Sequence, residues 1–182
     1  MKKILNIVLL SSMIFLIGAL RTNAQSNKKY KKISAKKVVY VNKSPNVSAV
    51  RYLPKATKKI TYKKTNYNFY NGRFYKTVQG NHIVVSPPKG LRIKVLPVGF
   101  ISFIVGSTRY YHYEGIYYTY LAGIDEYEVV NAPIGSLIKD LPNDIEVVVY
   151  KGKVYYEYHN VLYKKVEMQD GDAYEVVGQL EE

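Results

Sequence analysis

The sequence predicts an all-β protein made of tandem antiparallel β-hairpin or meander repeats, each about 44 residues long. Three Leu-Pro pairs mark the repeat, because Leu53-Pro54, Leu96-Pro97 and Leu141-Pro142 stand 43 and then 45 residues apart. Runs rich in tyrosine, isoleucine and valine follow each pair, and these residues fit a pleated, half-buried surface. No segment of the mature chain shows capped apolar residues at helical spacing. We therefore expect small sheet or barrel-like units side by side.

Residues 1–24 read as a secretory signal peptide. Lys2 and Lys3 precede the apolar stretch 4–20, and Ala24 supplies a small residue at the cleavage site. The alternative is an uncleaved membrane anchor, because the apolar run is close to the lower limit for spanning, about 17 residues. After cleavage we expect no transmembrane span. The expected location is extracytoplasmic, either periplasmic or secreted, in a bacterium.

A basic leader follows at residues 25–44. Its composition favours flexibility, although the run 38–41 could add a strand. Residues 25–113 carry 19 Lys and Arg and no acid, whereas residues 114–182 carry 14 acids and 5 bases. The basic arm could therefore dock on the acidic end within one molecule, or link molecules head to tail.

A dense cationic run attracts polyanions, so the lysines of the leader and of the first repeat are candidate polyanion contacts. The alternative interpretation is a solvated tail that keeps the protein soluble. The candidate lysines are Lys28, Lys29, Lys31, Lys32, Lys36, Lys37, Lys58, Lys59, Lys63 and Lys64.

Three repeats divide the rest of the chain, at residues 45–87, 88–132 and 133–178. The first is degenerate, because it lacks the Pro-x-Gly opening of the other two, and it has either decayed or caps the array. Each repeat carries a hairpin turn: Asn71-Gly72 is a strong type I′ signal, and Glu114-Gly115 and His159-Asn160 occupy the same place. A similar period is typical of propeller blades, but three copies are too few to close a propeller within one chain.

Tyrosines crowd both sides of each hairpin turn. Because alternate strand residues face opposite sides, they line both faces of the sheet. They either form cross-strand pairs in a thin core, or leave one set exposed as an aromatic platform for sugar rings or peptide strands. The candidate ligand contacts are Tyr110, Tyr111, Tyr113, Tyr117, Tyr118, Tyr155, Tyr156, Tyr158 and Tyr163.

The sequence offers no constellation for catalysis. There is no cysteine, which excludes disulfides, thiolate ligands and cysteine nucleophiles, and no nucleophile elbow, metalloprotease helix motif or glycine-rich phosphate loop. Stacked repeats could bring the exchanged pairs at 112–114 and 157–159 together, but nothing in the spacing demands a metal site. We expect no catalytic residue, no metal and no cofactor, with an envelope hydrolase as a residual alternative.

The order of motifs, Pro-x-Gly, Leu-Pro, Tyr-Tyr-x-x-x-Gly-x-Tyr-Tyr and Tyr-x-Val-Val, resembles an uncharacterised domain-of-unknown-function family of secreted Gram-negative bacterial proteins. Residues 88–133 carry the pattern best, and residues 133–178 repeat it with Asn160 for glycine and Leu162-Tyr163 for Tyr-Tyr. The resemblance implies an all-β envelope protein and no established activity. It therefore implies no catalytic residues.

We predict a non-enzymatic module that associates with the anionic cell envelope through its basic N-terminal region and its tyrosine-rich hairpins. The expected partner is an anionic envelope polymer or lipid surface, or an envelope protein, and no specific nucleic-acid recognition is expected. The alternative is a structural or assembly protein whose sheet edges or opposite charges mediate self-association or protein contacts. The oligomeric state is left open.

Overall fold

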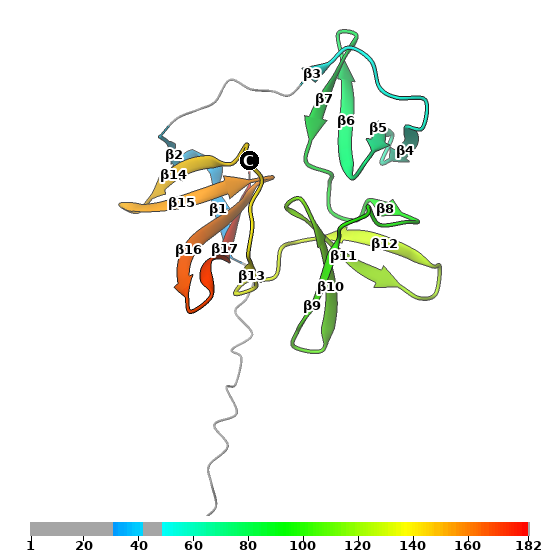
Figure 1. The fold of residues 1–182 in the computed structure, drawn as a ribbon. Helices are drawn as coiled ribbons and strands as arrows, with labels where there is room; N and C mark the ends of the chain where they lie inside the picture. The colour runs from blue at the N-terminus through cyan, green and yellow to red at the C-terminus, as the bar shows by residue number, and fades with distance from the viewer. Residues whose placement is uncertain (1–30, 42–48, 182) are drawn as a thin grey trace, which may run out of the picture.

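The computed structural model describes residues 31–41 and 49–181 (Figure 1). It confirms the all-β prediction, with three antiparallel sheets and, within these residues, one short 3₁₀ turn as the only helical element, η1 (Ala35–Lys37). No helix in this part of the chain is long and apolar enough to cross a membrane. The signal peptide predicted at residues 1–24 lies outside the described residues.

Each sheet contains one short strand and a four-stranded meander, and the third sheet has two further strands from the N-terminal segment. The first sheet holds β3 (Ala49–Val50), β4 (Lys58–Tyr62), β5 (Thr65–Tyr70), β6 (Arg73–Val78) and β7 (Asn81–Val85). The second holds β8 (Arg92–Ile93), β9 (Ile101–Val105), β10 (Thr108–Tyr113), β11 (Ile116–Leu121) and β12 (Glu126–Val130). The third holds β13 (Leu137–Ile138), β14 (Glu146–Tyr150), β15 (Lys153–Tyr158), β16 (Val161–Met168) and β17 (Gly171–Glu181).

The strand order is the same in all three sheets. The short strand pairs with the last strand of its own sheet, β3 with β7, β8 with β12 and β13 with β17. The meander then runs back to its first strand, so β4 and β9 lie at the edges of the first and second sheets. The repeat length and the repeat boundaries inferred from the motifs stay predictions.

The central hairpin turns have the backbone conformation that the sequence predicts. Both turn residues have positive φ in Asn71-Gly72 (47° and 81°), Glu114-Gly115 (41° and 74°) and His159-Asn160 (51° and 65°). Positive φ at both positions defines a type I′ turn, whose twist matches the twist of the flanking strands.

Neighbouring sheets share their hydrophobic cores. Phe74 of the first sheet packs in one cluster with Leu91 and Tyr118 of the second. Tyr117 of the second sheet packs in the next cluster with Tyr163 of the third, and their hydroxyl oxygens lie 3.3 Å apart. Adjacent doublet residues point to opposite faces of a strand, so Tyr118 joins the core toward the preceding sheet and Tyr117 joins the core toward the following one. Shared cores join the three sheets in a row.

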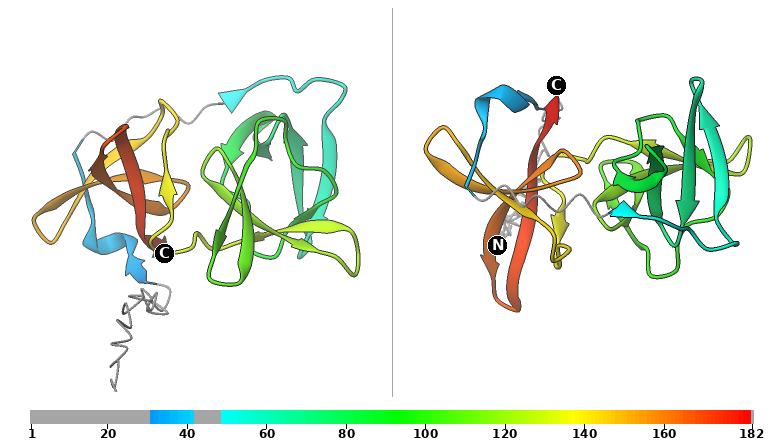
Figure 2. Two further views of the ribbon diagram at one scale, coloured as in Figure 1. Left: turned by 60° about the horizontal axis from the view of Figure 1, so that its bottom comes forward. Right: turned by 90° about the horizontal axis from the view of Figure 1, so that it is seen from above.

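The N-terminal segment 31–41, which we call the strap, closes the far side of the third sheet. Its strand β1 (Lys32–Ser34) pairs in parallel with β17, and β2 (Val39–Tyr40) pairs antiparallel with β14. The strap therefore covers both edges of the third sheet (Figures 1 and 2). Ile33 and Val38 pack against Leu162 in a third cluster.

The strap corrects the expectation of a flexible leader at 25–44 for the residues that the structure describes. Lys32 forms an ion pair with Glu181 at 2.7 Å, so the basic arm docks on the acid-rich end within one molecule. The short apolar run ending at Val41 supplies β2. Local composition favoured disorder, but the segment gains its order from strand pairing and apolar packing on the third sheet.

The outward face of the first sheet carries a group of polar residues beside the buried Tyr75. Asn68 Nδ2 donates to Thr77 Oγ1 at 3.4 Å, and Thr77 Oγ1 lies 3.0 Å from His82 Nδ1. The equivalent residues of the second sheet are Tyr111, Tyr120 and Tyr127, whose rings pack together (centroids 5.1 Å apart in both contacts). A polar outer face is typical of a terminal capping repeat, which favours the cap interpretation over decay.

Candidate functional site

The first candidate surface is the exposed edge of the first sheet, formed by β4 and the turn that follows it. Register pairs Tyr62 with Thr65, so the connection to β5 is a two-residue turn made of Lys63 and Lys64. All four lysines of this segment are exposed. We call this surface the lysine edge; its members are Lys58, Lys59, Lys63 and Lys64.

The turn of the lysine edge has an unfavourable backbone conformation for its residues. Lys63 has φ 45° and Lys64 has φ 64°, both in the left-handed region that glycine and asparagine tolerate best. In the equivalent turn of the third sheet, Lys151-Gly152, Lys151 has φ 51° like Lys63, and glycine takes the second position, so Lys64 is the residue that distinguishes the lysine edge. Each non-glycine residue held there costs about 1 kcal/mol or more. The chain thus carries two cations at a tip where other residues would be more stable.

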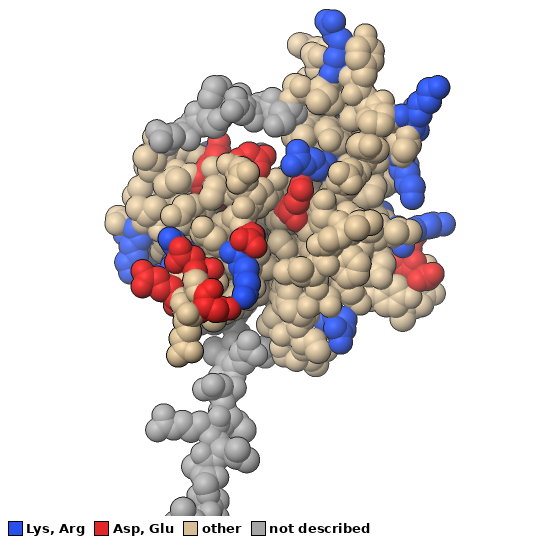
Figure 3. Space-filling model, viewed as in Figure 1, with Lys and Arg blue, Asp and Glu red and all other residues tan. Residues whose placement is uncertain are grey.

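The charges of the lysine edge lack acidic neighbours. Among the described residues, none of the ion pairs involves a lysine of this edge. The nearest acid in the sequence is Glu114, which binds Arg73 with 3.0 Å between Nε and Oε2. In the view of Figure 3, acidic side chains gather over the third sheet with some basic ones among them, whereas the charged side chains of the first sheet are all basic. The lysine edge is therefore an uncompensated cationic surface.

The candidate lysines of the leader do not extend this surface. Lys31, Lys36 and Lys37 are exposed on the strap, and Lys32 is ion-paired with Glu181. Lys28 and Lys29 lie outside the described residues. The strap lies against the third sheet, and β4 lies at the outer edge of the first (Figure 1). The structure thus divides the eight candidate lysines that it describes between two ends of the molecule.

Four of the nine candidate tyrosines belong to the core. Between 0% and 7% of the surface is exposed in Tyr117, Tyr118, Tyr158 and Tyr163, so these four side chains are too buried to contact a ligand. The other five are partly exposed and pack against neighbours, as in the stacking of Tyr110 on Phe103 (centroids 6.0 Å apart). Those five are Tyr110, Tyr111, Tyr113, Tyr155 and Tyr156. The clustered tyrosines therefore mainly pack against other residues of the sheets.

Histidine and glutamate at the hairpin tips serve the turns. The backbone N–H of Gly115 donates to His112 Nε2 at 3.0 Å, and that of Asn160 donates to Glu157 Oε1 at 2.6 Å. Burial lowers the pKa of His112 to about 4, so its ring is a neutral acceptor at neutral pH. Burial raises the pKa of Glu157 to about 7, although the hydrogen bond from Asn160 acts in the opposite direction. In the part of the chain that the structure describes, no group of three such residues is placed to hold a metal ion.

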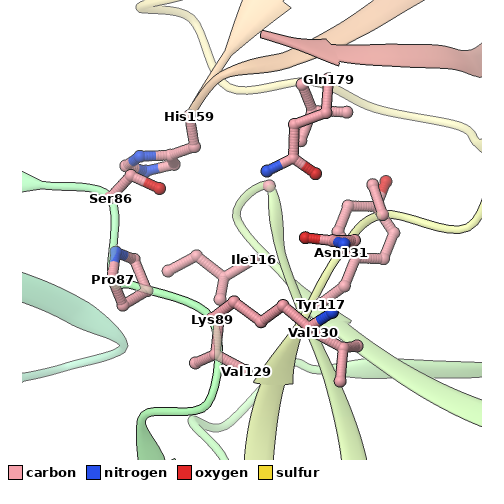
Figure 4. Close-up of a pocket in the computed structure, with 13 residues that line it drawn as sticks. Ser86, Pro87, Lys89, Ile116, Tyr117, Val129, Val130, Asn131, His159 and Gln179 are labelled. Atoms are coloured by element: carbon pink, nitrogen blue, oxygen red, sulfur yellow. The ribbon is translucent and has the colours of Figure 1, made fainter. Parts of the chain in front are cut away.

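A small cavity lies where the second and third sheets meet the connection between the first and second (Figure 4). Figure 4 shows the side-chain amides of Gln179 and Asn131 directed toward the space, with His159 and Lys89 at its rim. The Oε1 atom of Gln179 is buried and has no hydrogen-bond partner among the described residues. The cavity volume is about 30 Å³, enough for about one water molecule. It is too small for a sugar or a cofactor, so the lysine edge is the better candidate.

Comparison with protein families matches residues 24–180 to the Family of unknown function (DUF6515). The chain belongs to this family. The match covers most of the chain and agrees with the resemblance to an uncharacterised domain family. Comparison with the curated proteins and with the solved structures gave no match. A function for this member of DUF6515 must therefore be argued from its own residues.

Sequence reasoning found the lysines but missed what makes Lys63 and Lys64 unusual. A Lys-Lys pair is not a turn signal, so the left-handed conformation could not be inferred from those two residues. The repeat spacing holds the missing signal, because it aligns them with Gly106-Ser107 and Lys151-Gly152. Both of those pairs contain a glycine in a turn.

Proposed function

We propose that the protein is a non-enzymatic, extracytoplasmic module that binds an anionic envelope polymer or lipid surface through the lysine edge. The observation that carries the proposal is the turn at Lys63-Lys64, where two exposed cations occupy left-handed positions. Strained residues that persist at one site favour a functional role for that site. Cations without acidic partners are available for an external anion.

Edge protection explains only part of the lysine edge. Lysines on an edge strand prevent pairing with another chain, and this accounts for Lys58 and Lys59 on β4. Lys63 and Lys64 lie beyond the strand, in a turn where an added strand would find no ladder to continue. Their position favours contact with an anion at the tip.

An aromatic ring supports one cation of this surface. Lys63 Nζ lies 5.3 Å from the ring centroid of Tyr62. Such contacts hold an ammonium group near a flat ring without neutralising its charge. The combination suits a phosphate or carboxylate polymer, with electrostatic capture as the main contribution and aromatic contact as the smaller one.

The test replaces the turn by the residues that a type I′ turn favours. The variant K63N/K64G removes two charges and relaxes the backbone, so it should unfold at a higher denaturant concentration than the wild type. Its binding to peptidoglycan, lipopolysaccharide or anionic vesicles should weaken about thirtyfold at low salt, since each of the two lysines contributes about 1 kcal/mol near an anionic surface. Co-sedimentation of the mature chain at several salt concentrations measures this.

The matched control is K151N/K153N, which removes two exposed lysines from the corresponding hairpin of the third sheet. It should keep binding close to that of the wild type. Equal loss in both double variants would show that only net charge matters, and wild-type binding that does not change with salt would overturn the proposal. Binding to anionic vesicles, with none to zwitterionic vesicles or to peptidoglycan, would identify a lipid headgroup as the source of the anionic groups.

A further inference from the structure

The edge strand β9 of the second sheet presents an exposed apolar surface. Among the described strands, none pairs with its outer side. Residues 95–108 contain no charged side chain. Five apolar residues of this strand and of the connection that precedes it are exposed, with the fractions Val95 64%, Val98 96%, Phe100 43%, Ile101 46% and Ile104 60%. A long apolar edge is a template for pairing with another strand.

The three equivalent edge strands of the molecule differ in how they are protected. The first-sheet strand β4 carries lysines, and the third-sheet strand β14 is covered by β2, with Val149 opposite Val39. Ile104 of β9 is the equivalent of Val149, by a spacing of 45 residues. β9 has neither the charges of β4 nor, among the described residues, the cover of β14. The third sheet shows that this edge position accepts an antiparallel strand.

We propose that β9 pairs antiparallel with β9 of a second copy of the chain, joining two second sheets across a two-fold axis. A register centred on Phe103 places Ile101 opposite Val105 of the mate. It also places Ser102 opposite Ile104. Apolar side chains then meet on the face of Ile101, and no charges are brought together. The interface is self-complementary, because the same strand supplies both sides.

A second copy suits this edge better than a lipid surface. The outer side of β9 presents N–H and C=O groups, and lipid tails cannot satisfy those groups. A second β9 strand supplies backbone partners and apolar side chains together. A polyanion is excluded as the occupant, because residues 95–108 carry no cation to attract it. The nearest cations in the sequence, Lys94 and Arg109, lie outside this run.

A groove of about 440 Å³ adjoins the start of β9. It is lined by Gly99, Ile101 and residues 112–114 of the second sheet, and by residues 137–140 of the third, so its wall carries charged side chains beside the apolar ones. In the proposed register the end of the mate's β9 arrives here, followed by its small turn residues Gly106 and Ser107. The dimer would hold two lysine edges in one particle, so a polyanion could be bound at two points. The inference goes beyond the proposed function and does not depend on it.

The test is sedimentation equilibrium of the mature chain over a wide concentration range at high salt, where charge-driven head-to-tail association is screened. The wild type should show a reversible dimer. The variant I101K/I104K gives β9 the protection that lysines give β4, and the dimer dissociation constant should rise by about tenfold or more. Both substituted residues are exposed, so the fold should tolerate the change.

The matched control is V154K/M168K, which places two lysines at exposed apolar positions on β15 and β16. Both are interior strands of the third sheet, so this variant should dimerise like the wild type. A wild type that is monomeric at every concentration would overturn the proposal. So would a monomer whose binding to vesicles is lost in I101K/I104K, since that result assigns the surface to lipid.

The absence of native cysteine allows the register to be tested directly. An equimolar mixture of S102C and I104C should form a disulfide-linked dimer under mild oxidation, whereas each variant alone should cross-link much less. The control T61C, at the equivalent position of β4, should not cross-link. Equal cross-linking of all three variants, or of none including the mixture, would contradict pairing through β9.

Discussion

The first and third sheets have the same strand order, yet their outward faces are closed in opposite ways. The first sheet carries a group of polar residues there, in which Asn68, Thr77 and His82 bond to one another. The third sheet keeps apolar residues such as Leu162 on its outward face and covers them with the strap. A row of sheets that share cores must either change its last face to polar residues or acquire a cover. This chain uses one solution at each end.

The largest loss of stability is expected from a substitution in the strap. Ile33 is 4% exposed and packs against the third sheet, so I33A should lower the free energy of unfolding by about 2–5 kcal/mol, as expected for a buried large-to-small change. Urea unfolding of the mature chain measures it. The control V39A, at a strap residue that is 66% exposed, should cost about 0.5 kcal/mol or less. If both variants unfold like the wild type, the strap is not the cover that the third sheet needs.

Glu157 lies on the strap side of the third sheet, in register with Glu146. Burial, followed by the charges of Glu157 and Glu146, raises the pKa of Tyr40 in the strap to about 12. Glu157 itself has a folded pKa of about 7 against an ordinary value of 4.5. The folded state therefore binds more protons than the unfolded state between these two values. The contribution of Glu157 to the free energy of unfolding is full below about pH 4.5 and is lost as pH rises through 7.

The isosteric variant E157Q removes this titration and keeps an oxygen for the N–H of Asn160. The wild-type free energy of unfolding, minus that of E157Q, should fall by up to about 3 kcal/mol between pH 4.5 and 7, and stay level above. His112 and His159 have pKa values lowered to about 4 by burial, so they act with the opposite sign, but they cancel in the difference. A difference that rises with pH would contradict a buried, protonated Glu157.

The all-β class and the hairpin turns follow from the sequence because their signals are local. The Asn71-Gly72 pair favours a turn with positive φ at both residues, and this turn directly joins the two strands beside it. The strap could not be predicted in the same way, because its order comes from pairing Lys32 with Gln179, far along the chain. A lysine-rich segment looks disordered until a partner surface is known.

For the candidate tyrosine contacts, the sequence predicts which residues gather at the hairpins but not which of them are buried. Alternation told us that the tyrosines face both sides of their strands, and it could not tell us that both sides are covered. Tyr117 and Tyr118 point in opposite directions, and each enters a core shared with a neighbouring sheet. Burial of the doublet is therefore a property of the row of sheets, which no single repeat reveals.

The smallest expected loss of stability concerns the glycines of the hairpin turns, and it depends on whether the turn touches the next sheet. A Cβ atom at Gly115 would collide with the ring of Tyr158 in the next sheet, as one at Gly72 would with Tyr113. G115A should therefore destabilise by about 1–3 kcal/mol more than G152A, whose glycine has a similar positive φ (71° against 74°) and open space around it. Chemical denaturation measures both.

The same reasoning explains Asn160, which occupies the glycine place in the third hairpin. It is exposed and has φ 65°, a conformation that asparagine tolerates, and among the described residues no further sheet stacks a tyrosine on it. N160G should change the free energy of unfolding by a few tenths of a kcal/mol at most, while G115N should be at least as damaging as G115A. If G115N is tolerated as well as Asn160 is, glycine is required only by the turn, and the stacked tyrosine does not determine it.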